Sequence, residues 1–197
     1  MKTFNVSLVG VGGQGILLTA DLLAKTAAIA GMDVKKSEIH GMAQRGGSVI
    51  SQVRFGSEVA SPIIQEGTSD ILVSFDKLEA LRWAHLCAKG GKALVNDLYL
   101  VPVTVSSGQQ AAPEDLDGKI KKAFSGAVVI DAAAIAEKEV CNPRTMNMVI
   151  AGALSAFTPF KERDWLKALG EILSGPKAKL LDVNKKAFAL GRKAALG

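Results

Sequence analysis

A glycine-rich turn near the N-terminus is the first place where residue types and spacing indicate binding chemistry. Gly10, Gly12 and Gly15 satisfy the pattern G-x-G-x-x-G, directly after an apolar run that ends at Val9 and before a run of helix formers. Glycine lets the backbone approach a phosphate group closely, and a helix N-terminus offers free N–H groups and the positive end of a dipole. The turn therefore predicts phosphate or nucleotide binding, with tight helix–sheet packing as the alternative.

The residues at the end of the next predicted strand bear on which nucleotide could bind. Dinucleotide-binding folds place an acidic residue for the ribose about 20 residues after the glycine turn. This chain has Lys35, Lys36 and Ser37 there, and only then Glu38. Two cations suit a ligand with an extra phosphate, such as the 3′-phospho-ADP of coenzyme A or the 2′-phosphate of NADP. The alternative is that both lysines are solvated charges at a strand end.

A polar loop over residues 38–48 contains glycines and lacks a regular apolar period, so it builds no core of its own. His40 could act as a general base, because imidazole titrates near neutral pH. A hydrogen-bonded structural role or a partner contact is the alternative. Arg45, followed by Gly46 and Gly47, has the planar guanidinium that binds a carboxylate or phosphate through two hydrogen bonds. An intersubunit salt bridge explains the same arginine equally well.

The rest of the sequence offers no self-sufficient set of catalytic groups. We find no nucleophile–base pair, no carboxylate pair and no magnesium-binding aspartate cluster. Cys87 and Cys141 are the only cysteines and lack the Cys-x-x-Cys spacing of a metal or iron–sulfur site. We expect both to be buried thiols in a reducing cytoplasm. We therefore expect no resident metal and no demanding chemistry by this chain alone.

Length and composition restrict the class of protein. The 197 residues suit one domain over residues 1–197, and 48% apolar with 5% aromatic residues indicates a core of aliphatic side chains. The formal charge of +5 favours an anionic ligand or partner. Nucleic acid is disfavoured, because the lysines are dispersed and few aromatics could stack on bases. We see no signal peptide and no apolar run that spans a bilayer, so we expect a cytoplasmic protein.

Strand and helix patterns alternate through the first two thirds of the chain, and the C-terminal third is helical. We predict strands over residues 4–9, 32–37, 49–55, 70–75, 92–96, 99–105 (edge-like) and 127–130, and helices over 16–30, 76–89, 116–124, 131–138, 147–157, 161–173 and 177–196. Only a loop joins the second and third strands, so these two can be antiparallel. The pattern predicts an α/β fold, a Rossmann-like three-layer αβα sandwich with a mostly parallel sheet that need not be wholly parallel.

Several of these motifs together resemble one family of enzymes. They are the turn G-V-G-G-Q-G at 10–15, the loop E-I-H-G-M-A-Q-R-G-G at 38–47, Arg54-Phe55-Gly56, Asp70, Glu79-Ala80-Leu81-Arg82 and Asn147. The chain resembles the gamma subunit or gamma domain of the 2-oxoacid:ferredoxin oxidoreductases, and within that family it is most similar to the small (beta) subunits of indolepyruvate ferredoxin oxidoreductases. The loop is much more particular than the turn, which many folds share.

The resemblance implies a share in the oxidative decarboxylation of a 2-oxoacid, such as indolepyruvate or another aryl or branched 2-oxoacid, to acyl-CoA with reduction of ferredoxin. It implies that thiamine diphosphate, magnesium and 4Fe-4S clusters reside on a large alpha subunit, and that this chain assists the coenzyme A step. The predicted cofactor-binding residues are Gly10, Gly12, Gly13, Gln14, Gly15, Lys35, Lys36 and Glu38. The loop predicted to face the partner's active site comprises His40, Gly41, Met42, Gln44, Arg45, Gly46, Gly47 and Ser48, joined by Asn147.

One segment departs from the family pattern. The resemblance implies a glutamate at a strand end where this chain has Ser74-Phe75-Asp76, and Asp76 is the candidate substitute. Two other functions stay open on the sequence alone. An independent NAD(P)-dependent oxidoreductase would use the same glycine turn, and a binding module without an enzymatic role would use the same loop.

Overall fold

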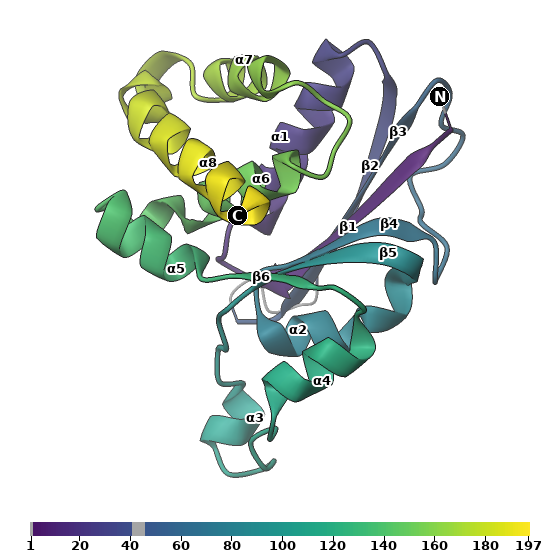
Figure 1. Ribbon diagram of the computed structural model, residues 1–197, viewed down its shortest axis with the longest axis vertical. Helices are drawn as coiled ribbons and strands as arrows, with labels where there is room; N and C mark the ends of the chain where they lie inside the picture. Colours follow the sequence, from purple (N-terminus) through teal and green to yellow (C-terminus); the bar gives the residue numbers. More distant parts are fainter. Residues whose placement is uncertain (1, 41–45) are drawn as a thin grey trace.

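The computed structural model describes residues 2–40 and 46–197, with only the backbone described at His40. Its strands are β1 (Phe4–Val11), β2 (Asp33–His40), β3 (Ser48–Gly56), β4 (Ser69–Ser74), β5 (Cys87–Asn96) and β6 (Val128–Ile130). They form a six-stranded sheet of order β2-β3-β1-β4-β5-β6 (Figure 1). β1, β4, β5 and β6 run parallel, whereas β3 is antiparallel to both β1 and β2. The predicted α/β fold with a mostly parallel, mixed sheet is confirmed.

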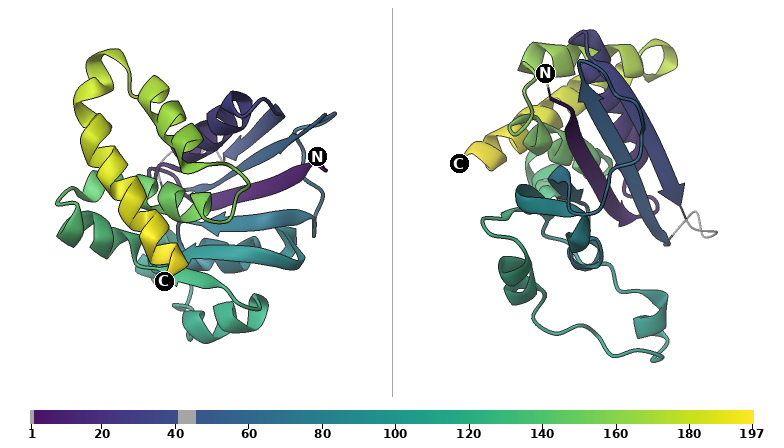
Figure 2. Two further views of the ribbon diagram at one scale, coloured as in Figure 1. Left: turned by 45° about the horizontal axis from the view of Figure 1, so that its top comes forward. Right: turned by 90° about the vertical axis from the view of Figure 1, so that its right-hand side faces the viewer.

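Helices cover both faces of the sheet. They are α1 (Ile16–Ile29), α2 (Lys77–Arg82), α3 (Val103–Ser106), α4 (Leu116–Ala123), α5 (Ala132–Ala134), α6 (Met146–Ser155), α7 (Glu162–Ile172) and α8 (Leu181–Leu196). One face carries α1, α6, α7 and α8, and the other carries α2 and α4 (Figures 1 and 2). The apolar side chains of the buried strands therefore pack into a cluster on each side, which makes three layers.

Close packing of two helices fixes where α6 begins. A Cβ atom added at Gly152 of α6 would lie 1.9 Å from the carbonyl oxygen of Phe188, and one at Gly191 of α8 would lie 1.8 Å from that of Val149. Only glycine permits the two backbones to approach this closely. Because α6 is almost wholly buried, this contact holds its N-terminus in place against the sheet.

The structure corrects the predicted helix over residues 76–89. Helix α2 ends at Arg82, a 3₁₀ turn follows at Ala84–Leu86, and Cys87 already pairs with Ser69 of β4. The local residues are good helix formers, but hydrogen bonding to a neighbouring strand outweighs a propensity of a few tenths of a kcal/mol per residue. The first half of the predicted helix is therefore correct, and its second half, residues 83–89, is not α-helical.

The edge strand predicted over residues 99–105 is also wrong. Pro102, with φ −62°, is the N-cap of the short helix α3, and the Leu100 N–H bonds to the side chain of Asp76 rather than to a strand. The helix predicted over residues 131–138 is present as α5 followed by a π-helical segment, and the last predicted helix begins four residues late, after a 3₁₀ segment. The other predicted elements are present with shifted ends.

The expectation that both cysteines are buried is not met. Cys87 is half-buried at the start of β5, and Cys141 is exposed at a turn where its φ is +61°. Residue type predicts burial for cysteine in general, but the local chain direction places Cys141 at the surface. Burial does raise the pKa of the Cys87 thiol, against the opposing effect of a hydrogen bond to the backbone of Leu72.

Candidate functional site

The predicted site residues gather at the carboxyl edge of the sheet, where the chain changes face. β1 leads into α1 on one face, and the neighbouring parallel strand β4 leads into α2 on the other. Helices that leave adjacent strands on opposite faces open a crevice between them, and ligands of open α/β sheets bind in that crevice. The glycine turn, the end of the polar loop and the start of α2 all meet there.

The glycine turn is shaped by its own glutamine. The Gln14 side chain accepts a hydrogen bond from the Val11 N–H at 2.7 Å and donates one to the Phe75 carbonyl at 3.2 Å. A Cβ atom at Gly10 would lie 2.6 Å from Oε1 of Gln14 and 2.8 Å from Cβ of Phe75. Gly10 and Gln14 therefore fix the turn against β4, and the side chain predicted to contact a cofactor is engaged within the fold.

Two other glycines of the turn keep backbone groups available. Gly13 has φ +104° and Gly15, the N-cap of α1, has φ +86°, so both positions favour glycine. The Gly12 N–H is bonded to the Gly47 carbonyl at 2.8 Å, whereas those of Gly13 and Gly15 have no partner within the described part of the chain. These free groups at the mouth of a helix are what an anion requires.

The end of the polar loop is fastened to the turn and to α2. The Gly46 N–H lies 3.4 Å from the Gly12 carbonyl, which adds to the bond between Gly12 and Gly47. Ser48 donates its hydroxyl to the Glu79 carboxylate. The structure thus brings the predicted residues Gly46, Gly47 and Ser48 to the turn. The predicted residues Gly41, Met42, Gln44 and Arg45 lie outside the described residues, and the His40 backbone pairs with Val49 at the end of the β2–β3 hairpin.

The predicted lysines do not join this group. In the sheet, Lys36 of β2 lies opposite Val53 of β3, and Val53 lies opposite Val6 of β1. Val6 is four residues before Gly10 in the chain. At about 3.3 Å per residue, Lys36 lies about 13 Å from the turn along the strand and two strands across. Lys35 is one residue further away, so the position predicted for an extra phosphate is not beside the turn.

Both lysines already form ion pairs with carboxylates of this chain. Lys36 bridges Asp21 of α1 and Glu38, and Lys35 lies 3.8 Å from Asp33. Partial burial alone would lower the pKa of Lys36, but its hydrogen bonds to Asp21 and Glu38 raise that pKa. Lys36 and Glu38 thus form a surface ion cluster, and any contact that these residues make with a cofactor stays a prediction.

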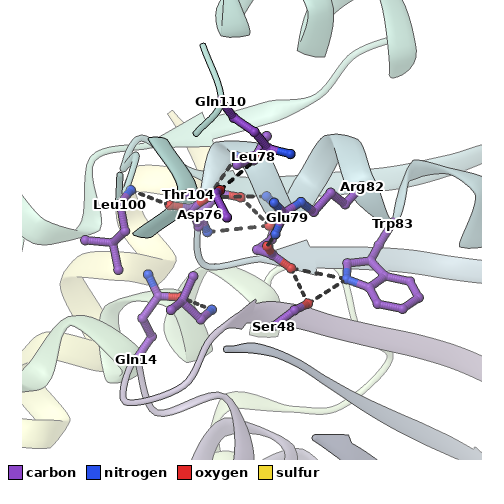
Figure 3. A network of polar contacts seen from close by, with 12 residues as sticks. Gln14, Ser48, Asp76, Leu78, Glu79, Arg82, Trp83, Leu100, Thr104 and Gln110 are labelled. Atoms are coloured by element: carbon purple, nitrogen blue, oxygen red, sulfur yellow. Dashed lines mark hydrogen bonds and ion pairs between the residues drawn. The ribbon is translucent and has the colours of Figure 1, made fainter. Parts of the chain in front are cut away.

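A buried carboxylate forms the centre of the crevice on the α2 side (Figure 3). The Glu79 side chain is 2% exposed and lies 2.6 Å from the Arg82 guanidinium. The indole Nε1 of Trp83 lies 3.2 Å from its other oxygen and 3.1 Å from the Ser48 hydroxyl. Glu79, Ser48 and Arg82, together with Asp76, line a cleft of about 300 Å³ that the apolar segment 100–103 also lines. The arrangement satisfies each polar group without a ligand.

Asp76, the candidate substitute for the expected glutamate, acts as a cap in this structure. One carboxylate oxygen accepts the backbone N–H groups of Leu78 (2.8 Å) and Glu79 (3.2 Å) at the start of α2, and the other accepts that of Leu100 at 2.7 Å. Burial raises the pKa of Asp76 against the lowering effect of these three bonds, and Glu79 adds to the rise. Its geometry is that of an N-cap.

The α6 side of the turn holds a second hollow, of about 280 Å³, lined by Gly13, Gly15, Arg144 and Asn147. Asn147 is the second residue of α6 and is 8% exposed. Its side chain packs so closely on the turn that a Cβ atom at Gly15 would lie 2.7–2.9 Å from it. The structure therefore places Asn147 beside the turn, although it is distant in the chain, and its predicted role with the loop that faces the partner stays a prediction.

Two residues of this edge had no predicted site role. Glu79 was identified only as part of a family motif. Its side chain bonds to Ser48 and Trp83, and the sequence alone does not show the contact with Ser48. Arg144 follows Asn142 and Pro143, and the Asn142 side chain accepts the Arg144 N–H. Asparagine followed by proline is a helix-start signal, and a helix start next to an arginine could have indicated an anion site.

Comparison with known proteins identifies the family. A family model described as pyruvate ferredoxin/flavodoxin oxidoreductase matches residues 5–194. The chain belongs to this family. It is 40% identical over 198 residues to indolepyruvate oxidoreductase subunit IorB of Pyrococcus horikoshii, covering 99% of this chain and 97% of that one. It is 30% identical to ketoisovalerate oxidoreductase subunit VorA of Methanothermobacter marburgensis. That alignment covers 96% of this chain and only 36% of the VorA subunit.

Solved structures agree on the fold. The gamma subunit of a keto/oxoacid ferredoxin oxidoreductase from Geobacter sulfurreducens superposes with a TM-score of 0.72 at 22% identity, covering 98% of each chain. A second structure is the 2-oxoglutarate:ferredoxin oxidoreductase of Magnetococcus marinus, solved with 2-oxoglutarate, coenzyme A and succinyl-CoA bound. It superposes with a TM-score of 0.75 at 23% identity, and the alignment covers all of this chain and 31% of that one. This fold thus occurs as a separate subunit in the Geobacter protein and as part of a longer chain in the Magnetococcus enzyme.

The residues that the structure describes also allow two statements about sites. No group of three or more histidine, cysteine, aspartate or glutamate side chains among them is arranged to hold a metal ion. In the same part of the chain, no helix combines the length and apolar character needed to cross a membrane. Free backbone N–H groups and an arginine gather at the carboxyl edge, and such donors suit an anionic ligand.

Proposed function

We propose that this chain is the non-autonomous gamma-type subunit of a 2-oxoacid:ferredoxin oxidoreductase, folded as one domain over residues 1–197. The complex converts a 2-oxoacid and coenzyme A to acyl-CoA, CO₂ and reduced ferredoxin in the cytoplasm. The relatives named as indolepyruvate and ketoisovalerate subunits support indolepyruvate, or another aryl or branched 2-oxoacid, as the substrate. A large alpha subunit supplies thiamine diphosphate, magnesium and 4Fe-4S clusters.

One observation carries this proposal. The carboxyl edge presents free N–H groups at Gly13 and Gly15 beside the fastened loop end at Ser48, while the carboxylates of Asp76 and Glu79 are fully engaged in structural bonds. Such an edge can bind and orient an anionic ligand, but none of its described groups is poised to attack one. Chemistry therefore belongs to the partner, and this chain supplies one wall of the site.

Within that wall, the chain's residues have distinct tasks. Gly12, Gly13 and Gly15 form the phosphate-receiving turn, and Gly10 and Gln14 hold its shape. The loop from His40 to Ser48 faces the partner's active site, where His40 and Arg45 position ligand or partner groups. When bound, coenzyme A supplies the thiol that accepts the acyl group. The chain's share is to hold its anionic part and to help exclude water from the joint site.

The NAD(P)-dependent alternative loses its main geometric support. A dinucleotide fold needs the end of the second strand next to the glycine turn. Here β3 lies between β1 and β2, so the residues after Lys35 are two strands removed from that turn. The sheet order therefore favours the subunit role over an independent nicotinamide enzyme.

Reconstitution tests the proposal. The full chain and its thiamine-binding partner are purified separately and together, and dye reduction that depends on both 2-oxoacid and coenzyme A is measured. We expect activity only in the mixture. Activity of the isolated chain, or tight NADPH binding without any affinity for coenzyme A, would refute the proposal.

A further inference from the structure

The strand β2 forms one edge of the sheet, and its outer side carries no strand in the part of the chain that the structure describes (Figure 2). The strand at the other edge, β6, has three residues, whereas β2 has eight. A long open edge presents a row of backbone N–H and C=O groups that can bond to another strand. We propose that β2 pairs antiparallel with β2 of a second copy of this chain, with Lys36 of each copy opposite Glu38 of the other.

The hydrogen-bond pattern of the sheet identifies the backbone groups of β2 that point outward. The Gly12 N–H bonds to the Gly47 carbonyl in continuation of the β1–β3 register, so the even-numbered residues of β1 bond to β3. Antiparallel strands alternate bonded and non-bonded pairs, so successive residues of β3 bond to β1 and β2 in turn. In the observed register, the odd-numbered residues of β2 therefore bond to β3. The even-numbered ones, which include Val34, Lys36 and Glu38, direct their N–H and C=O groups away from the sheet.

The charges of β2 select one register for the pair of copies. Two residues directly opposite each other both direct their backbone groups toward the partner strand or both away from it, so their numbers are both even or both odd. Two registers of this kind pair all but one of the eight residues. One sets Lys36 opposite Lys36, and the other sets Lys36 opposite Glu38 with Ser37 on the two-fold axis. Like charges directly opposite destabilise a sheet and opposite charges stabilise it, which favours the second register.

The features that usually protect an edge strand from pairing are absent or neutralised in β2. Residues 33–40 contain no proline or glycine, and their pairing with β3 runs without a bulge. Lysine at an edge also opposes pairing, because its charge is costly to cover. Here Lys36 bridges Asp21 and Glu38, and Lys35 lies 3.8 Å from Asp33. Both ammonium groups are thus already paired with carboxylates, and a second copy adds a further carboxylate beside Lys36.

Both faces of the extended sheet suit this register. The side chains of Lys36 and Glu38 lie on the α1 face, where Lys36 contacts Asp21. A two-fold axis perpendicular to the sheet keeps α1 of both copies on that same face, so the two Lys36–Glu38 pairs lie side by side. On the other face, Ile39 is 56% exposed and lies opposite Lys35 of the second copy. The apolar stem of a lysine can cover such a side chain while its charge stays in water.

Charge reversal tests the pairing by sedimentation equilibrium of the full chain over a series of concentrations. Lys36→Glu and Glu38→Lys each set two pairs of like charges opposite each other, and each is expected to weaken the dimer by about tenfold or more. An equimolar mixture of the two variants sets opposite charges against each other at both places, and it should dimerise as the wild type does. Mixing changes no contact within either chain, so this recovery separates pairing from a loss of stability. The exposed Lys177→Glu is the matched control and should dimerise normally.

A disulfide tests the register in the isolated chain and in the complex assembled with the partner. Ser37 lies on the proposed axis, where the Cα atoms of a non-bonded antiparallel pair are about 4.5 Å apart and within reach of a disulfide. In a Cys141→Ser background, Ser37→Cys is expected to form a covalent dimer of this chain on mild oxidation. Ile39→Cys, on the same face, is the control. It lies about 13 Å from its own copy across the axis and should form none.

Three results would overturn the pairing. The first is a wild-type chain that stays monomeric at all concentrations while Ser37→Cys forms no covalent dimer, alone or in the complex. The second is a mixture of Lys36→Glu and Glu38→Lys that associates no better than either variant alone. The third is a disulfide from Ser37→Cys to the thiamine-binding partner, which would assign the edge to that subunit. None of these measurements uses substrate or coenzyme A, so the pairing stands or fails independently of the proposed function.

Discussion

The two hollows beside the glycine turn differ in how their polar groups are bonded. In the α2-side cleft, all four carboxylate oxygens of Asp76 and Glu79 accept hydrogen bonds or ion pairs from the chain itself. In the α6-side hollow, the Asn147 amide and the Arg144 guanidinium have no such partners in the described part of the chain. A satisfied polar network stabilises a fold, whereas donors that the chain leaves unbonded around a hollow are available to a ligand.

This difference predicts that mutations in the α2-side cleft and in the α6-side hollow change different properties of the protein. Changes in the cleft should reduce the stability of the subunit. Changes in the hollow should reduce ligand affinity with little effect on stability. The predictions that follow test this separation, beginning with the largest expected effect.

The first prediction concerns Glu79. Glu79→Ala leaves the half-buried donors of Ser48 and Trp83 without this acceptor, so we expect the free energy of unfolding to fall by about 2 kcal/mol. Urea denaturation of the isolated chain measures it. Arg144→Ala, made in the other hollow, should stay within about 0.5 kcal/mol of wild type. Equal losses for both variants would remove the distinction between the two hollows.

The second prediction concerns the glutamine that shapes the turn. Gln14→Ala removes the acceptor for the Val11 N–H and the donor to the Phe75 carbonyl, and it should lower the free energy of unfolding by about 1–2 kcal/mol. Thermal and urea unfolding report the change. The matched control is the exposed Gln65→Ala, which should be near neutral. A neutral Gln14→Ala that nevertheless loses ligand affinity would restore the cofactor contact that the sequence predicted.

The third and smallest prediction is a pH dependence from Asp76. Its pKa is raised in the folded state, mainly by burial, so the folded chain binds a proton more tightly than the unfolded chain does. The contribution of Asp76 to stability is therefore highest below the unfolded pKa and decreases as pH rises through the folded value. The stability of Asp76→Asn relative to wild type should increase with pH across that window.

Denaturation at a series of pH values measures this slope, with the exposed Glu114→Gln as the control for general charge effects. A difference between Asp76→Asn and wild type that is constant with pH would show that burial does not govern this carboxyl group.

The sequence predicted the parts of the fold that depend on local patterns. The strand, glycine turn and helix over residues 4–29, the third strand and the C-terminal helices follow from apolar period and helix-start or helix-end signals. The short loop before the third strand allowed its antiparallel direction without predicting it. The family resemblance found through the turn and the polar loop is confirmed. Residues 83–89 were misassigned as α-helix because pairing of Cys87 with Ser69 decides their state, and that contact is not visible locally.

The site was only partly predictable for the same reason. The turn was found from its spacing, and Asn147 from the resemblance. The roles of Gln14 and Lys36 depend on which groups the fold places near them, namely Phe75 for Gln14 and the Asp21 carboxylate for Lys36. Arg144 was not assigned: the helix start beside it is a local signal, but its place near the turn depends on tertiary packing that the sequence does not show.

The most direct test is the coenzyme A dependence of 2-oxoacid oxidation by the complex assembled with Arg144→Ala. If this chain holds the anionic part of coenzyme A and the partner performs the chemistry, KM for coenzyme A should rise by about tenfold while kcat is retained. A lower kcat with an unchanged KM, or no change in either constant, would contradict the account.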